Sequence, residues 1–161
     1  MGQAAGPAEP GRTALRRTRA DCRVLVIDDN TDAADTVAMF LETEGFPTVV
    51  GYCAEDAFRE VDRQPVDVAI LDIGLPDMNG YEIASAMRGR EDRPLLIAVT
   101  GWGSQADIDK AFQAGFDFHF TKPAPLPEIL AILDHRCVGE HLSYDPQRGR
   151  QLRPVAGKRR E

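Results

Sequence analysis

The 161-residue sequence has few cysteines and no long apolar run, which argues against a disulfide framework, a zinc site and a membrane span. Its three cysteines are an odd number without metal-ligand spacing, so we predict neither a disulfide framework nor a zinc site but three reduced thiols. The longest apolar stretches, residues 24–27 and 95–99, are far too short to cross a bilayer. Arginines near the N-terminus are not followed by an apolar segment, so we predict no secretory signal and a cytoplasmic protein.

Positive charge is scarce in the middle of the chain. Residues 21–135 carry eight basic and twenty-two acidic side chains, whereas residues 1–20 and 136–161 are both net basic. An acidic body argues against nucleic acid as the main partner. It fits a surface that meets basic partners, or a site that gathers carboxylates around a cation.

The two ends differ from the middle in composition. Residues 1–20 are rich in Gly, Ala, Pro and Arg without an apolar period, which predicts a disordered arm. Residues 136–161 predict a disordered basic tail that is too short for a second globular domain. One structured domain over residues 21–135 remains.

Two patterns alternate within this domain. Short apolar runs predict buried strands, and segments with helical spacing predict helices between them. The strands are expected at residues 24–27, 48–52, 66–71, 95–99 and 116–120. The first helix would begin near Asn30, Thr31 or Asp32 and stop at Gly45, and the second would span residues 54–63. Five strands alternating with five helices predict an α/β fold with a doubly wound parallel sheet.

Polar residues follow four of the five predicted strands. Asp28 and Asp29 follow the first, Asp72 the third, Thr100 the fourth and Lys122 the fifth. Parallel strands place their carboxyl ends at one edge of the sheet, so these side chains are expected to meet there.

The expected cluster of three carboxylates suggests a particular chemistry. Crowded carboxylates repel one another unless a cation neutralises them, and Mg²⁺ takes oxygen ligands of this kind. One acid could then act as a nucleophile that forms an aspartyl phosphate. Asp72 is the best candidate, with Asp28 and Asp29 as the metal pair. Thr100 would donate a hydrogen bond to the phosphoryl group, and Lys122 would neutralise its charge.

Four motifs in this order resemble the response-regulator receiver domain of two-component signalling. The resemblance covers about 115 residues. Within the family, the chain is similar to stand-alone receivers such as the chemotaxis response regulator and to a subgroup associated with hybrid kinases. The motifs are VLVIDDN at 24–30, LDIGLPDMNGYE at 71–82, AVTG at 98–101 and AGFDFHFTKP at 114–123. The resemblance implies a flavodoxin-like, five-stranded sheet in the order 2-1-3-4-5.

The resemblance also implies roles for individual residues. Asp72 would accept a phosphoryl group from a sensor histidine kinase or a histidine phosphotransfer protein. Asp29 would bind Mg²⁺ directly, Asp28 would act through water, and the carbonyl of Gly74 would be a further ligand. Lys122 would pair first with Asp72 and then with the phosphoryl group, and its bond to the following proline is commonly cis.

Two positions depart from the family pattern or vary within it. The family usually has Tyr or Phe three residues before the lysine, where this chain has His119. A structural histidine is the favoured interpretation, with an imidazole switch as the alternative. Trp102 lies where the family varies and tunes phosphoryl lifetime; loop packing is favoured over a shield for the phosphoryl group.

Other functions remain as alternatives. The chain could be a docking module that needs no phosphate, although every expected acceptor-site position is filled. Haloacid-dehalogenase-like phosphohydrolases place a second aspartate two residues after the nucleophile, and this chain has Gly74 there. No helix-turn-helix segment follows the domain, so we expect no DNA-binding output, no membrane and an unknown downstream protein. The sequence leaves homodimerisation on phosphorylation open.

Overall fold

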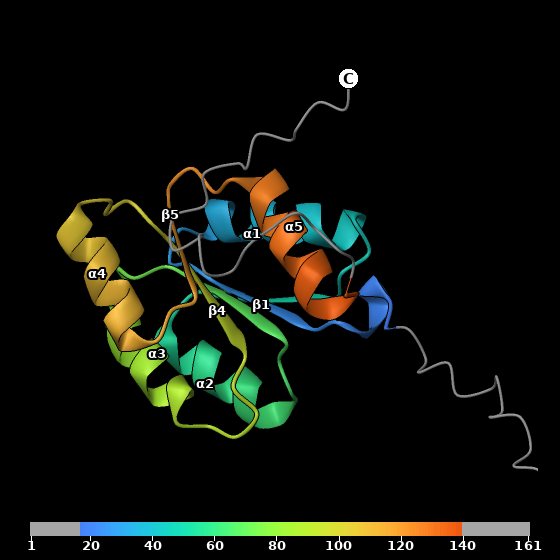
Figure 1. Ribbon diagram of the computed structural model, residues 1–161, viewed down its shortest axis with the longest axis horizontal. Coiled ribbons are helices and arrows are strands. Elements are labelled where there is room, and N and C mark those ends of the chain that lie inside the picture. Colours follow the sequence, from blue (N-terminus) through green and yellow to red (C-terminus); the bar gives the residue numbers. More distant parts are fainter. Residues whose placement is uncertain (1–16, 140–161) are drawn as a thin grey trace, which may run out of the picture.

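The computed structural model describes residues 17–139, and within them five parallel strands form a single sheet (Figure 1). The strand order is β2-β1-β3-β4-β5, which confirms the predicted doubly wound topology. The strands are β1 (Val24–Ile27), β2 (Thr48–Gly51), β3 (Val68–Leu71), β4 (Leu95–Thr100) and β5 (Phe118–Thr121). The central strands β1 and β3 are buried throughout, as their unbroken apolar sequences predict.

Helices cover both faces of this sheet. Figure 1 shows α1 and α5 on one face and α2, α3 and α4 on the other. The helices are α1 (Thr31–Thr43), α2 (Ala54–Arg63), α3 (Gly80–Arg88), α4 (Gln105–Ala114) and α5 (Leu126–Cys137), preceded by a short 3₁₀ helix, Arg19–Asp21. None of the helices in the described part of the chain is long and apolar enough to span a membrane.

The helix ends follow local sequence signals. Asn30 is the N-cap of α1, and its side chain accepts a hydrogen bond from the N–H of Ala33 at 3.1 Å. Ser104 forms a reciprocal capping box with Asp107 at the start of α4. Gly45 and Gly115 have positive φ where the chain turns after α1 and α4, a conformation that costs glycine little. The spans of β1 and α2 agree with prediction, whereas β3 and β5 each begin two residues late.

Each face of the sheet has its own apolar core. Alternate side chains of β1, β3 and β4 point to opposite sides, so Leu25 and Ala98 join α2, α3 and α4, while Val26 and Val99 join α1 and α5. Burial of these two clusters is the main source of stability for such a sheet.

The amino-terminal end of the sheet carries an ion-pair cluster. The guanidinium of Arg19 donates to both carboxylate oxygens of Asp134 on α5, at 2.8 and 2.7 Å, and to the carbonyl of Glu44 at 2.8 Å. It also lies over the ring of Phe46. Residues 17–20 and 136–139 therefore contact the domain, whereas the rest of the predicted arm and tail lies outside the described residues.

A disulfide joins the start of β1 to the end of α5. Cys22 and Cys137 are both buried, their Cα atoms are 5.7 Å apart, and their sulfurs are bonded. The prediction of three reduced thiols was wrong for this pair, because spacing along the chain says nothing about residues 115 positions apart. Cys53 is the free cysteine of the described residues.

The loop between β3 and α3 is fastened at two points. The carboxylate of Asp77 accepts the N–H groups of Ala54 and Glu55 at 2.9 and 3.2 Å and so caps α2 from a distant part of the chain. Accepting the Ala54 N–H lowers the pKa of Asp77. Gly80 begins α3 directly behind the end of β3. A Cβ there would lie 2.6 Å from the Cα of Ile73.

Reducing the disulfide should lower the free energy of unfolding by about 2–4 kcal/mol, because the bond closes a long loop in the unfolded chain. Urea denaturation with and without dithiothreitol measures this difference. Cys22→Ser should abolish the response to reductant, and Cys53→Ser, the matched control, should leave it intact. Superimposable curves for oxidised and reduced wild type would contradict the assignment.

Replacing Gly80 by alanine should destabilise the protein by about 1–3 kcal/mol, because two backbone segments would have to separate. Gly89→Ala at the other end of α3 is the control, since the nearest atom to its added methyl is 3.9 Å away. Thermal unfolding of both variants provides the measurement. Equal melting temperatures would show that the close contact behind β3 does not constrain the fold.

Candidate functional site

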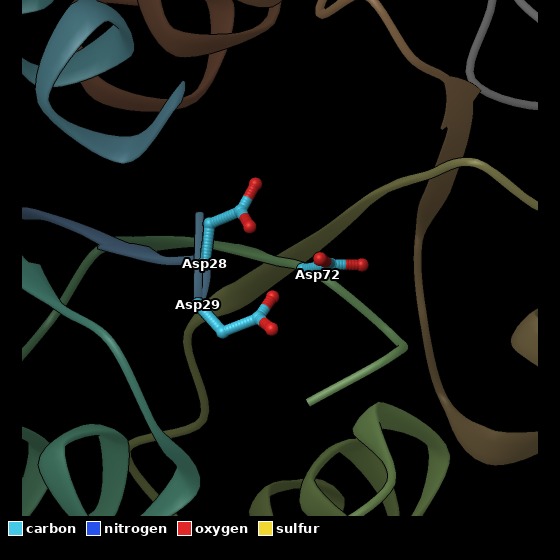
Figure 2. Close-up of side chains that lie close together, drawn as sticks. All are labelled: Asp28, Asp29 and Asp72. Atoms are coloured by element: carbon cyan, nitrogen blue, oxygen red, sulfur yellow. The ribbon is translucent and has the colours of Figure 1, made fainter. Parts of the chain in front are cut away.

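Three aspartates gather at the carboxyl edge of the sheet. Asp28 and Asp29 directly follow β1, and Asp72 directly follows β3, the strand beside it. One carboxylate oxygen from each lies within 4.8 Å of the others. Figure 2 shows Asp28 and Asp29 turning toward the side on which Asp72 lies. The strand ends thus bring together the three acids that the sequence placed at one edge.

Lys122 reaches into this cluster from the end of β5. Its Nζ lies 2.8 Å from Oδ2 of Asp28 and 3.1 Å from Oδ2 of Asp72, so one ammonium bridges two carboxylates. The peptide bond between Lys122 and Pro123 is cis, as the family resemblance implied. Burial acts to lower the pKa of Lys122, but its bonds to Asp28 and Asp72 outweigh this effect and raise it. Lys122 is therefore a cation at neutral pH.

The surroundings of Asp28 disfavour its charged form. It is buried, and burial raises its pKa despite hydrogen bonds from Lys122 and from the N–H of Asn30. The nearby charge of Asp72 raises this pKa further. An additional cation in the cluster would oppose both effects.

Gly74 contributes backbone groups to the same edge. Its N–H donates to Oδ1 of Asp72 at 3.1 Å, which holds the carboxylate whose other oxygen meets Lys122. A Cβ built on Gly74 would lie 3.5 Å from Cζ2 of Trp102, so the indole rests over this loop. The residue is exposed, and its carbonyl is available as a ligand.

Thr100 is near the cluster but is engaged elsewhere. Its Oγ1 accepts a hydrogen bond from the N–H of Trp102 at 3.2 Å, and its carbonyl accepts from the N–H of Lys122 at 2.7 Å. The side chain is buried, with 1% of its surface exposed. The hydroxyl predicted to serve a phosphoryl group is thus held by the loop after β4 in this arrangement.

The donor set fits a hard divalent cation. Three carboxylates against one ammonium leave two negative charges without a partner in the cluster, and the donors are all oxygen. Asp29 is exposed while Asp28 and Asp72 are buried, so an ion here would keep a side open to water. Asp28, Asp29, Asp72 and the Gly74 carbonyl are the groups that could hold Mg²⁺.

A groove of about 670 Å³ leads to these residues. Its lining includes residues at the start of α1 and after β5, together with Asp28, Asp72 and Lys122. Much of the remaining lining is apolar, including Val37 and Leu126.

Sequence reasoning missed two contacts that shape the site. Asp77 was read only as part of a motif, and its capping of α2, more than twenty residues away, has no local signal. The contact between Trp102 and the Gly74 loop was also missed, although a lone tryptophan beside the predicted hydroxyl was a clue.

Comparison with protein-family models matches residues 24–134 to the response regulator receiver domain. The chain is 31% identical over 109 residues to the regulatory protein VanR of Enterococcus faecium, covering 68% of this chain and 47% of that protein. It is 34% identical over 110 residues to the transcriptional regulatory protein KdpE of Mycobacterium tuberculosis, covering 68% and 48%. The chain thus spans about half the length of these relatives.

Solved structures agree with this match. A CheY-like receiver domain protein from Methanospirillum hungatei superposes with a TM-score of 0.66 at 28% identity, covering 71% of this chain and 95% of that one. A Burkholderia pseudomallei response regulator, solved with a phosphorylated aspartic acid and a calcium ion, has a TM-score of 0.65 at 27% identity, covering 70% and 66%. Sequence motifs, sheet order and site geometry lead to one conclusion: the chain belongs to the response regulator receiver domain family.

Proposed function

We propose that this receiver accepts a phosphoryl group on Asp72, with Mg²⁺ held by Asp28, Asp29, Asp72 and the carbonyl of Gly74. The observation that carries the proposal is the position of Lys122, whose ammonium bridges Asp28 and Asp72 within a cluster of three carboxylates. Before transfer, the ammonium of Lys122 partly neutralises the carboxylates of Asp28 and Asp72. After transfer, it can move to the negatively charged phosphoryl group.

Transfer of the phosphoryl group needs little covalent chemistry from the protein. A carboxylate oxygen of Asp72 bonds to phosphorus while the phosphorus–nitrogen bond of the donor histidine breaks, and the nitrogen keeps the electron pair. Lys122 moves from the carboxylate of Asp72 to the phosphoryl oxygens and neutralises them. Mg²⁺, when bound, supplies further neutralisation of charge on the phosphoryl group.

Thr100 completes the proposed site only after a rearrangement. Its hydroxyl must leave the N–H of Trp102 before it can bind a phosphoryl oxygen. Phosphorylation is therefore coupled to the loop between β4 and α4, and this coupling would be how Asp72 alters a partner surface.

The groove at the site suits a donor protein. Its mostly apolar lining and the charged residues Asp28, Asp72 and Lys122 fit a helix that presents a phosphohistidine, so the proposed donor is a sensor histidine kinase or a histidine phosphotransfer protein. We further propose that the protein is cytoplasmic and that its receiver spans residues 21–135.

Neither alternative function gains support from the site. A docking module that needs no phosphate would not require three acids and a bridging lysine in contact. A phosphohydrolase needs a general acid beside its nucleophile, and the residue two positions after Asp72 is Gly74, which has no side chain to supply one.

Wild-type protein incubated with acetyl phosphate should gain one phosphoryl adduct that depends on Mg²⁺, and Asp72→Asn should gain none. Intact-mass spectrometry provides the measurement. Asp32→Asn, an exposed aspartate on α1, is the matched control and should be modified like the wild type. A folded wild type that stays unmodified under every condition would favour the docking module.

Replacing Lys122 by methionine should leave Asp28 and Asp72 facing each other without their cation and lower the melting temperature by roughly 5 °C. Millimolar Mg²⁺ should restore stability in this variant more than it stabilises the wild type, because the ion replaces the missing charge. Differential scanning calorimetry with Mg²⁺ and with EDTA tests this. An identical effect of Mg²⁺ on both proteins would argue against an ion between these carboxylates.

A further inference from the structure

The carbonyl of Gly74, the backbone ligand proposed for Mg²⁺, lies in a tight turn after β3. The peptide group that contains this carbonyl also contains the N–H of Leu75, which donates to the carbonyl of Ile73 at 3.1 Å. This peptide is trans, and a trans peptide directs its N–H and its carbonyl to opposite sides, so the bond turns the Gly74 carbonyl away from Ile73. Gly74 is exposed, and glycine has more backbone freedom than any other residue. The direction of its carbonyl therefore depends on what holds the rest of the loop.

The two ends of this loop are fastened to each other. The N–H of Gly80, at the start of α3, donates to the carbonyl of Ile73 at 2.8 Å. At the other end, the N–H of Gly74 donates to Oδ1 of Asp72 at 3.1 Å. These bonds fix the loop where it leaves β3 and where it enters α3. They do not restrain residues 75–78, which lie between the two ends.

Asp77 fastens that middle segment to α2. One carboxylate oxygen accepts the N–H of Ala54 at 2.9 Å and the other accepts the N–H of Glu55 at 3.2 Å. The N-cap residue of α2, Cys53, makes no capping bond with its own side chain, so Asp77 serves the first turn from outside the helix. A carboxylate is well suited to this place, because the N-terminus of a helix carries partial positive charge.

We propose that Asp77 is a positioning residue of the metal site, which keeps the Gly74 carbonyl in its Mg²⁺-binding orientation by tying the loop to α2. The inference rests on the function proposed above and deepens it by naming a residue that sets the affinity of that site for its ion. The coupling is reciprocal. An ion held by the Gly74 carbonyl therefore also restrains the loop and protects the first turn of α2.

Tryptophan fluorescence can follow ion binding, because the single tryptophan of the chain, Trp102, rests over Gly74. The experiment titrates wild type, Asp77→Ala and Asp77→Asn with MgCl₂. The rise of melting temperature with MgCl₂ gives the same dissociation constants independently of fluorescence. Asp77→Ala should bind Mg²⁺ about three- to tenfold more weakly, since the hydrogen bonds that hold the loop are lost.

The asparagine variant separates hydrogen bonding from charge. Both variants lose the same negative charge, but the amide oxygen of Asn can still accept an N–H of α2, and Asn caps helices about as well as Asp. Asp77→Asn should therefore stay within about twofold of the wild-type dissociation constant. Asp56→Ala is a further control at the same end of α2, because that carboxylate bonds to Tyr52 and Arg59. It should behave like Asp77→Asn.

Amide hydrogen exchange at Ala54 and Glu55 tests the coupling in the other direction. Saturating MgCl₂ should slow exchange of these two N–H groups in the wild type and leave it unchanged in Asp77→Ala. If Asp77 only stabilised α2, its loss would speed this exchange without changing the affinity for Mg²⁺. Equal dissociation constants for Asp77→Ala and Asp77→Asn would overturn the inference.

The acetyl phosphate adduct keeps this test apart from the test of Asp72. At saturating MgCl₂ every variant at position 77 should still gain the adduct, because Asp77 does not touch the phosphoryl group. A wild type that binds Mg²⁺ and gains the adduct, beside an alanine variant with the same affinity, would overturn the role of Asp77 alone. A folded wild type without any adduct would overturn the proposed function itself.

Discussion

Mutual repulsion among three carboxylates is the constraint on which this structure depends. The sheet brings Asp28, Asp29 and Asp72 together at one edge, and burial disfavours the charged form of Asp28. Lys122 relieves part of the repulsion by bridging Asp28 and Asp72. Three carboxylates against one ammonium leave the site short of positive charge, which a divalent cation could supply.

The sequence predicted those parts of the molecule that depend on local pattern. Apolar runs and caps located the strands and helices, and strand ends located the acids, because a parallel sheet sends every strand end to the same edge. The resemblance to receivers predicted the strand order, which periodicity alone could not supply. The pairing of Cys22 with Cys137 and the capping of α2 by Asp77 were not predictable, since both join residues far apart in the chain. The hydrogen bond from the N–H of Trp102 to the Thr100 hydroxyl was also not predictable, because a hydroxyl at a strand end has several donors and acceptors within reach.

The two loops beside Asp72 are held in different ways. The loop after β3 is pressed against Gly80 and is tied to α2 through Asp77, so its backbone has little room to move. The backbone of the loop after β4 is held by a hydrogen bond from the N–H of Trp102 to the hydroxyl of Thr100. On the function proposed above, a rearrangement that starts at Asp72 is expected to move the loop before α4 more readily than the loop before α3, because the latter has the more numerous contacts.

The disulfide has a consequence for how such a domain can be combined with others. Cys22 lies before β1 and Cys137 ends α5, so the chain enters and leaves at neighbouring points on the edge of the sheet opposite the aspartates. A domain whose entry and exit adjoin can be spliced into a longer polypeptide, or circularly permuted, with little disturbance to either host or guest. In such a combined protein, the aspartates would lie at one edge of the sheet and the connections to the rest of the polypeptide at the opposite edge.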